Sequence, residues 1–370
     1  MEYKKILVTG GAGLIGSHVV DELLKVGYKV RIMDNLGQPT HDGSIPPWLN
    51  KNAEFIQGDI RIKIDWQKAL IDVDAIIHLA AYMDFHLDFS TYIRTNVESV
   101  ALMFEVITEN KLPIKKIIAA SSQSVYGEGK YYCTKHGEMY LPPREREQLS
   151  RHDWEQHCAK CNEVAVPVAE LENDLLSPFI PYAVSKLSSE QLLFSLGKLY
   201  NIPTVALRYS IVLGARQSFR HFYSGALRAF TVNVLNHEPI SMNEDGQQIR
   251  DFVHVHDVAQ AHLVVLQDER ANDQIFNVGS GESTCVVDLA KIVAEVAGVR
   301  FEPLLTNRYR VGGARHSVMN VSKLKNLGWE PTQTLNRMVS DYLAWVRQFK
   351  NFSGVLKNNE DEMRAQGLLK

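Results

Sequence analysis

The chain has 370 residues, of which 45% are hydrophobic, and 40 Lys and Arg against 43 Asp and Glu give a formal net charge of −3. A chain of this length and composition can bury a sizeable core, as one large α/β unit or two coupled lobes. The charge balance provides no basic face for nucleic acid and no polybasic membrane segment, which favours a small, moderately polar ligand. Because the N-terminus lacks the pattern of a signal peptide and no apolar run approaches membrane-spanning length, we expect a cytoplasmic protein.

Apolar, β-branched runs alternate with longer helical patterns through residues 1–209. Strands are predicted at 4–10, 28–34, 53–59, 75–81, 114–122 and 203–209, and helices at 14–26, 90–110 and 181–200. Strands that are apolar along their whole length are expected where both faces of a sheet are covered. The alternation therefore predicts an α/β fold in which a doubly wound parallel sheet forms a Rossmann domain.

The pattern becomes less regular over residues 210–350. Helices are predicted near 222–236, 256–268, 286–297 and 335–348, with short strands at 251–255 and 275–279. This pattern predicts a smaller, interleaved substrate-binding lobe with segments that return to the Rossmann domain. In the tail, residues 351–370, about the last fifteen residues are expected to be weakly ordered.

The first motif is "TGGAGLIGSH", which places Gly10, Gly13 and Gly16 at a strand-to-helix turn. Such glycines let the backbone approach a pyrophosphate, and the N-terminus of the following helix presents free N–H groups to the anion. Asp34 ends the second predicted strand, where a carboxylate can accept hydrogen bonds from an adenosine ribose and repel a 2′-phosphate. The motif favours NAD over NADP. The alternative is a glycine-rich turn followed by an Asp that only caps the next element.

The second motif is "PYAVSK", in which Tyr182 and Lys186 share one face at the start of a helix. A nearby ammonium group favours the phenolate form of a tyrosine, which can then accept a hydroxyl proton. Ser122 follows the apolar run 114–120, at the carboxyl edge where open α/β sheets bind ligands. Each residue alone has a structural explanation, but together they predict a Ser–Tyr–Lys site that oxidises an alcohol by hydride transfer.

These motifs resemble the extended short-chain dehydrogenase/reductase family, in particular its nucleotide-sugar epimerases and dehydratases. The resemblance runs from about Ile6 to Trp345 and includes "TGGAGLIGSH", "DNL", "GDI", "HLAA", "TNV", "SSQSVYG", "PYAVSK", "RDFVHVHDVAQA" and "FNVGSG", in this order. It implies that Ser122, Tyr182 and Lys186 are catalytic and that the substrate is a nucleotide-diphosphate sugar. A homodimer is also expected.

The same resemblance implies two sets of binding residues. The implied NAD-binding residues are Gly10, Gly13, Leu14, Ile15, Gly16, Asp34, Asn35, Asp59, Ile60, Leu79, Ala80, Ala81, Asn96, Tyr182, Lys186 and Tyr209. The implied substrate-binding residues are Ser122, Gln123, Ser124, Arg216, Arg250 and Arg310. Arginine suits the latter role because its planar fork pairs with phosphate oxygens.

Departures from the family pattern concern the reaction and the substrate. Family dehydratases carry an Asp–Glu pair where this chain has Gln123 and Ser124, neither of which is a useful acid or base. Ile211 and Gly313 stand where relatives often have Asn and Asp, so the substrate is expected to be anchored differently. An epimerase is the favoured function. The alternatives are a 4-dehydrogenase or keto-sugar reductase, a 4,6-dehydratase and a non-catalytic NAD-sensing scaffold.

An insert at residues 128–178 interrupts the resemblance and contains three of the four cysteines. Cys133 and His136, then 21 residues, then Cys158 and Cys161 have the paired spacing of a structural zinc site. Four protein ligands leave no open position for catalysis, and a metal would help a small polar insert to fold. Unrelated thiols are one alternative. A nucleic-acid zinc knuckle is another, but residues 127–178 carry 6 basic against 10 acidic side chains.

Overall fold

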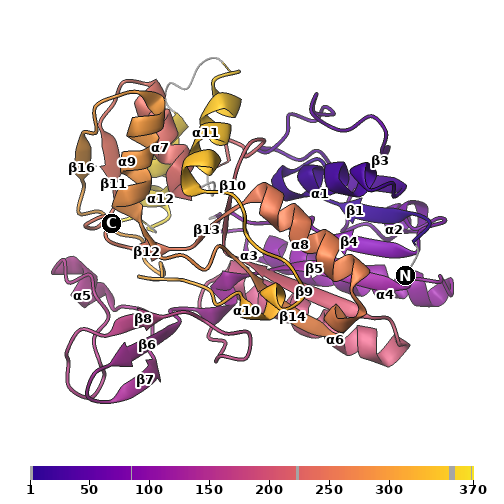
Figure 1. The fold of residues 1–370 in the computed structure, drawn as a ribbon, viewed down its shortest axis with the longest axis horizontal. Helices are drawn as coiled ribbons and strands as arrows, with labels where there is room; N and C mark the ends of the chain where they lie inside the picture. Colours follow the sequence, from indigo (N-terminus) through magenta and orange to yellow (C-terminus); the bar gives the residue numbers. More distant parts are fainter. Residues whose placement is uncertain (1–2, 85, 222–224, 350–354, 368) are drawn as a thin grey trace.

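The computed structural model describes residues 3–84, 86–221, 225–349, 355–367 and 369–370. These residues form a seven-stranded parallel sheet with the strand order β14-β9-β5-β4-β1-β2-β3 (Figure 1). In chain order its strands are β1 (Ile6–Thr9), β2 (Val30–Asp34), β3 (Glu54–Gln57), β4 (Ala75–His78), β5 (Lys116–Ser122), β9 (Thr204–Tyr209) and β14 (Gln274–Val278). The order reverses between β1 and β4, as it does in a doubly wound sheet. The predicted Rossmann fold is therefore confirmed.

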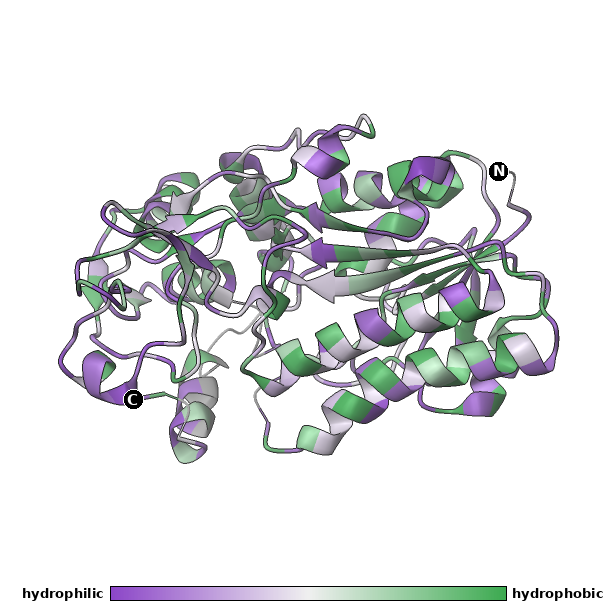
Figure 2. Ribbon diagram, turned by 90° about the horizontal axis from the view of Figure 1, so that it is seen from below, coloured by the Kyte–Doolittle hydropathy of each residue, from purple (hydrophilic) through white to green (hydrophobic). Residues whose placement is uncertain are grey.

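Helices cover both faces of this sheet. On one face α1 (Leu14–Lys25) packs against α8 (Val255–Gln267), and on the other α2 (Lys63–Ala69) and α6 (Pro181–Tyr200) flank α4 (Ser99–Glu109). Ile6 and Val8 of β1 belong to the first core and Leu7 to the second, because successive side chains of a strand point to opposite faces. In Figure 2 the sheet strands are coloured mainly as hydrophobic, and the flanking helices carry both kinds of side chain.

The helix predicted at 90–110 contains a wider turn. It consists of α3 (Phe89–Tyr92), the π-helical segment η1 (Ile93–Glu98) and α4. Asn96, in the π-helical segment, turns its amide inward, where Oδ1 accepts from the Tyr82 backbone N–H at 2.7 Å and Nδ2 donates to Ser185 Oγ at 2.9 Å. π-Helical turns of this kind are frequent at functional sites.

The smaller lobe lies at the carboxyl ends of the strands and has its own hydrophobic core. Its helices are α7 (Gly225–Leu235), α9 (Val286–Ala297) and α11 (Leu335–Val346). Short strand pairs complete it: β10 (Ile211–Leu213) with β13 (Phe252–His254), β11 (Ile240–Met242) with β16 (Pro303–Leu305), and β12 (Ile249–Arg250) with β15 (Thr284–Cys285). Between β13 and β15 the chain returns to the large sheet with α8, η3 (Glu269–Ala271) and β14. It returns there again after β16 with α10 (Ser322–Lys325). Residues 222–224 of the helix predicted at 222–236 lie outside the described residues.

The insert after β5 begins beyond the short helix η2 (Gln123–Tyr126) and forms a separate three-stranded sheet with the order β7-β6-β8 (Figure 1). Its elements are β6 (Lys130–Cys133), β7 (Gly137–Tyr140), α5 (Arg146–Ser150) and β8 (Val166–Val168). Its hydrophobic core is small, with Tyr131, Leu141 and Ala165 buried and Met139 packed against them.

The described residues of the C-terminal tail include a helix, and the weak order expected for this segment stays a prediction. Helix α12 (Val355–Ala365) packs near α7, and Met363 and Leu369 are buried. The Tyr309 and Lys370 backbones exchange two hydrogen bonds of 3.1 Å. A few widely spaced apolar residues in a polar segment give little signal in the sequence, so this helix was not predicted. Among the described residues, no helix combines the length and apolarity needed to cross a bilayer.

Candidate active site

A cavity of about 1060 Å³ opens between the carboxyl ends of the sheet strands and the smaller lobe. This is the position at which open α/β sheets bind ligands. Twenty-one of the predicted residues line it: Gly10, Gly13, Leu14, Ile15, Gly16, Asp34, Asn35, Asp59, Ile60, Leu79, Ala80, Ala81, Ser122, Gln123, Ser124, Tyr182, Lys186, Tyr209, Arg216, Arg250 and Arg310. The structure thus brings three predicted groups, for NAD, catalysis and substrate, into one continuous space.

The glycine turn is shaped for close approach of a ligand to the backbone. Gly10 has φ +68°, and a Cβ there would lie 2.7 Å from the backbone nitrogen of Ala80. A Cβ on Gly16 would lie 2.2 Å from the Gly10 carbonyl oxygen, so neither position tolerates a side chain. Since α1 begins at Leu14, its free N–H groups lie beside this turn. The turn fits the pyrophosphate of a dinucleotide.

Asp34, at the end of β2, has two functions. Its Oδ2 accepts from the Ala12 backbone N–H at 3.0 Å, and its Oδ1 accepts from that of Leu36 at 2.9 Å. Asp34 therefore caps backbone N–H groups, as expected from the alternative in which it has a structural role. The carboxylate nevertheless lines the cavity, and each oxygen keeps acceptor capacity for a ribose hydroxyl.

Neighbouring loops of the predicted NAD site are held by side-chain hydrogen bonds. Asn35 Nδ2 donates to Asp59 Oδ2 at 3.2 Å, and Thr9 Oγ1 accepts from the backbone N–H groups of Leu79 and Ala80, also at 3.2 Å. Asn96 is the exception among the predicted residues, because it does not line the cavity. Its amide orients the loop at Tyr82 instead.

Two elements, β5 and α6, carry the Ser–Tyr–Lys set, and β9 lies beside β5. Ser122 ends β5, Tyr182 and Lys186 lie one turn apart at the start of α6, and Tyr209 pairs in register with Ser122. The Lys186 ammonium is buried and donates to the Ala120 carbonyl at 2.9 Å, so β5 fixes its position. Burial lowers the pKa of Lys186 to about 8.

Hydroxyl and amide groups surround Ser122. Its Oγ accepts from Ser124 Oγ at 2.9 Å and from the Ser124 backbone N–H at 3.2 Å. Gln123 Oε1 accepts from Ser317 Oγ at 3.1 Å. The two positions after Ser122 therefore provide polar contacts to the cavity without a titrating acid–base pair. Tyr209 lines the cavity, and its hydroxyl contacts His262 Nε2 at 2.9 Å.

The three predicted substrate arginines all line the cavity. Arg216 pairs with Asp21 at 2.7 Å. The guanidinium of Arg250 is held by backbone carbonyls, including that of Arg315 at 2.8 Å, and burial lowers its pKa. A further arginine of the cavity, Arg228, was missed because it lies outside every recognisable motif.

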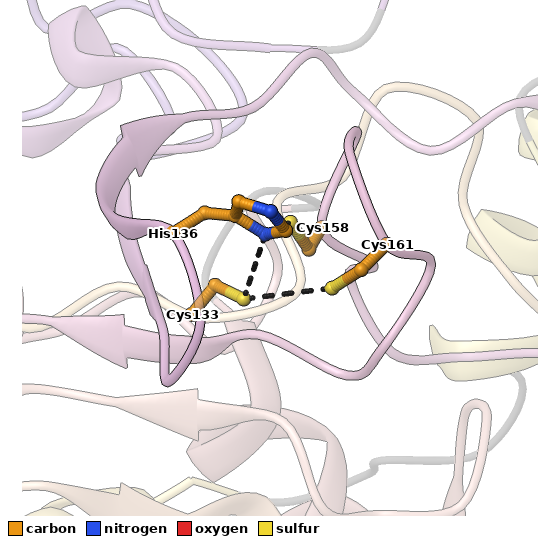
Figure 3. Close-up of side chains that lie close together, drawn as sticks. All are labelled: Cys133, His136, Cys158 and Cys161. Carbon is orange, nitrogen blue, oxygen red and sulfur yellow. Dashed lines mark hydrogen bonds between the residues drawn. The ribbon is translucent and has the colours of Figure 1, made fainter.

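The four predicted metal ligands meet in the insert (Figure 3). Cys133 and His136 flank the β6–β7 turn, and Cys158 and Cys161 flank a second turn. Their ligand atoms all lie within 4.8 Å of one another. Cys133 Sγ is 3.6 Å from His136 Nδ1 and 3.7 Å from Cys161 Sγ, and Cys158 Sγ is 3.4 Å from His136 Nδ1. Ligands at zinc bond lengths in a tetrahedron are about 3.5–3.8 Å apart, so these atoms can surround one ion.

The sequence of this chain is similar to those of known nucleotide-sugar epimerases. The model of the NAD dependent epimerase/dehydratase family matches residues 6–279. A dTDP-L-rhamnose 4-epimerase from Burkholderia thailandensis is 30% identical over 352 residues, covering 93% of this chain and 95% of that protein. A putative UDP-glucose 4-epimerase from Methanocaldococcus jannaschii is 31% identical, covering 92% of this chain and 98% of that protein.

Two solved structures are similar over nearly the same range. UDP-glucose 4-epimerase from Thermotoga maritima, in complex with UDP-glucose, has a TM-score of 0.74 at 29% identity, covering 93% of this chain and 99% of that one. UDP-glucuronic acid 4-epimerase from Bacillus cereus, in complex with UDP-glucuronic acid and NAD, has a TM-score of 0.76 at 26% identity, with the same coverage of both chains. The glycine turn, the Ser–Tyr–Lys set and these matches agree, and the chain belongs to the NAD-dependent epimerase/dehydratase family.

Proposed function

We propose that this protein is an NAD-dependent nucleotide-sugar epimerase. The observation that carries the proposal is the single cavity that joins the glycine turn to Ser122, Tyr182 and Lys186, with Gln123 and Ser124 in place of a dehydratase acid–base pair. NAD, when bound, supplies a hydride acceptor that can later return the hydride. The solved relatives with UDP-sugars support a nucleotide-diphosphate sugar as substrate.

Each residue of the set has a distinct role. The Tyr182 phenolate removes the proton of a sugar hydroxyl as that carbon is oxidised, and later returns a proton. Ser122 donates a hydrogen bond to the same oxygen. Lys186, fixed by the Ala120 carbonyl, favours the charged form of Tyr182 and is placed to hold the cofactor ribose.

Inversion requires the keto-sugar to present its other face before hydride returns. The smaller lobe supports this step because it provides separate anchoring groups for the nucleotide, so the sugar can rotate while the nucleotide stays bound. If hydride does not return, the same residues give a 4-dehydrogenase. A keto-sugar reductase would use them in the opposite direction.

The test is a panel of nucleotide sugars incubated with purified enzyme, without added oxidant, and analysed by NMR. UDP-glucose, UDP-glucuronic acid, UDP-N-acetylglucosamine and dTDP-L-rhamnose represent the classes handled by relatives. We expect an equilibrium mixture of two epimers from at least one member, with no net reduced nicotinamide. One reduced nicotinamide per product would favour the dehydrogenase, and no turnover would favour the NAD-sensing scaffold.

We also propose that Cys133, His136, Cys158 and Cys161 bind one structural zinc ion. Three of the distances between their ligand atoms are 3.4–3.7 Å, as in tetrahedral coordination, and all four atoms lie within 4.8 Å of one another. The 3.7 Å between Cys133 Sγ and Cys161 Sγ is far too long for a disulfide, in which the sulfur atoms are about 2.05 Å apart. The insert has few buried apolar residues, so a metal would replace the stabilisation that a larger core provides. Metal analysis of protein purified without chelator should give one zinc per chain, and none would contradict the site.

A homodimer and a cytoplasmic location complete the proposal. Phe89 and Ile93 are 54% and 48% exposed on α3 and η1, and Val184 is 42% exposed on the adjacent helix α6. Exposed apolar side chains on neighbouring helices favour an interface between subunits. The reduced thiols that a zinc site needs favour a reducing compartment. Light scattering coupled to size-exclusion chromatography tests the dimer, and cell fractionation tests the location.

A further inference from the structure

Residues 314–317 form a short segment that determines where the Arg250 guanidinium lies. The backbone carbonyls of Ala314 and Arg315 accept hydrogen bonds from this guanidinium at 2.9 and 2.8 Å. Ser317 pairs with Arg250 in an isolated β-bridge. Because Arg250 lines the cavity, a shift of this segment would move one of the predicted substrate-binding side chains.

The insert holds this segment from outside the cavity through the Glu155 carboxylate. Glu155 Oε1 accepts from the Arg315 guanidinium, from Nη2 at 2.5 Å and from Nε at 3.0 Å. The other oxygen, Oε2, contacts His316 Nε2 at 2.9 Å. One carboxylate thus binds two consecutive residues of the segment, and both of these residues are buried.

His316 connects Glu155 to β12, the strand that carries Arg250. Its Nδ1 accepts from the Ile249 backbone N–H at 3.0 Å. A neutral imidazole that accepts at Nδ1 carries its proton on Nε2, so Nε2 donates to Glu155. Burial lowers the pKa of His316, which favours this neutral form, although the hydrogen bond with Glu155 opposes the shift. The hydrogen bonds therefore run without a break from the insert to the residue before Arg250.

A neutral amide in place of the Glu155 carboxylate could not make both contacts. Arg315 and His316 each present a donor, so the group between them must accept at both ends. Glutamine has one oxygen and one NH₂ group, and a donor would therefore face a donor at one end. Arg315 also pairs with Glu244 and Asp245. Its charge stays compensated when the Glu155 carboxylate is removed, so the fold should survive the substitution.

We propose that Glu155 is a positioning residue for substrate binding, which acts by fixing Arg250. The inference rests on the proposed function, since it takes Arg250 as a contact of the nucleotide sugar. Glu155 does not itself line the cavity, so its effect on the substrate would pass through Arg250. Asp34, at the NAD end of the cavity, is held by backbone groups of the Rossmann domain, so NAD binding should not depend on Glu155.

Calorimetric titration with NAD and with the four nucleotide sugars of the panel measures this effect. Glu155→Gln should weaken binding of whichever nucleotide sugar the wild type binds by about 10-fold, the scale of a lost hydrogen bond to a charged group. The affinity for NAD should stay the same. Glu147→Gln is the matched control, because it removes the same charge within the insert from a side chain that is 78% exposed.

A double-mutant cycle shows whether Glu155 acts through Arg250. Arg250→Gln should itself weaken binding of the nucleotide sugar. Adding Glu155→Gln to this variant should cause little further loss, because the guanidinium that Glu155 positions is already absent. Additive losses would show that Glu155 acts independently of Arg250 and would overturn the inference.

Hydrogen exchange in the absence of nucleotide sugar tests the positioning directly. The backbone amides of Ile249 and Ser317 should exchange faster in Glu155→Gln than in wild type or in Glu147→Gln. Unchanged exchange at both amides, or unchanged affinity for the nucleotide sugar, would overturn the inference while the proposed function stands. An equal loss of NAD affinity would indicate a general folding defect and also overturn it. If the wild type binds none of the four nucleotide sugars, the proposed function is rejected together with the inference that rests on it.

Discussion

Asp34 combines a structural and a selective role in one carboxylate. Because it lines the NAD cavity while accepting two backbone N–H groups, a cofactor 2′-phosphate would meet a negative charge that cannot turn away. We expect NAD to bind more tightly than NADP by about one to a few kcal/mol, roughly tenfold per 1.4 kcal/mol. Calorimetry with both cofactors measures the difference. Equal affinities would remove the basis for the assignment.

The proposed role of Tyr182 as a general base can be tested by removing only its hydroxyl oxygen. Tyr182→Phe should keep the fold and NAD binding but lower turnover by ~100-fold or more, the scale of a lost general base. Tyr200→Phe is the matched control, since Tyr200 ends the same helix and is 46% exposed. Near-native turnover of Tyr182→Phe on the true substrate would refute its role.

Lys186 should carry a stability cost that its function requires. Burial lowers its pKa to about 8 in the folded chain, against an ordinary value of 10.5. Between these values the unfolded chain binds more protons than the folded one, so stability rises with pH and the cost disappears above about 10.5. Lys186→Met should therefore unfold less readily than wild type at pH 7, by the order of a few kcal/mol, while losing activity.

Urea unfolding of both proteins, freed of nucleotide, from pH 7 to pH 10 measures this cost. The advantage of the variant should shrink as the pH rises through 8. A difference that does not change with pH would show that the buried charge is not its cause. The variant also loses the hydrogen bond from Lys186 to the Ala120 carbonyl, which the neutral amine can still donate above pH 8.

Sequence reasoning worked best for residues that belong to a motif. The glycine turn, Ser122, Tyr182 and Lys186 follow from local spacing and from the edge of a parallel sheet, and all of them line the cavity. Asn96 was predicted to contact NAD, but its amide is used to hold the loop at Tyr82. Arg228 could not be predicted as a cavity residue because its burial there is a property of the folded chain.

At the scale of elements, the insert is joined to the smaller lobe by buried ion pairs. Arg144 of the insert binds Glu244 at 2.9 and 3.0 Å, and Arg315 binds both Glu155 and Glu244. Glu244 also lines the cavity. Because removing one partner from a buried pair leaves the other charge uncompensated, a disturbed insert should affect substrate binding directly.

Cys158→Ser should therefore loosen residues 128–178 and weaken substrate use more than NAD binding. Hydrogen exchange should increase in the insert while β1 and α1 remain protected. Cys285→Ser is the control, because Cys285 lies outside the cluster. If KM for the sugar nucleotide and the exchange of the insert are both unchanged, the four residues do not form a structural metal site.

Most strands of the large sheet and the helices that cover it are predicted by the spacing of apolar residues in the sequence. Long buried strands and amphipathic helices each have a characteristic spacing. The elements that were not predicted depend on distant partners. β11 pairs with β16 more than sixty residues away, and α12 packs near α7. The π-helical turn at Asn96 depends on Ser185. Short elements stabilised by such contacts carry little local preference in the sequence.

At the scale of the whole molecule, the two lobes cannot be separated by one cut. The chain enters the smaller lobe after β9, returns to the large sheet at α8 and β14, and leaves it again at α9. We expect a fragment of residues 1–209 to be insoluble, because it lacks the edge strand β14 and the covering helix α8. Sedimentation of the expressed fragment, compared with the full chain, measures this, and a soluble, NAD-binding fragment would contradict it.

The late position of β14 also matters while the chain is being made. During synthesis the ribosome releases β9, which pairs with the earlier strand β5, some sixty residues before its second partner β14. Every residue of β9 is buried in the finished fold. Until then an apolar strand with unpaired backbone groups forms the border of the nascent sheet, and such borders recruit other chains. The interleaved order of the two lobes thus leaves the edge of β9 exposed to aggregation during synthesis. A chaperone that covers this edge should raise the yield of folded enzyme.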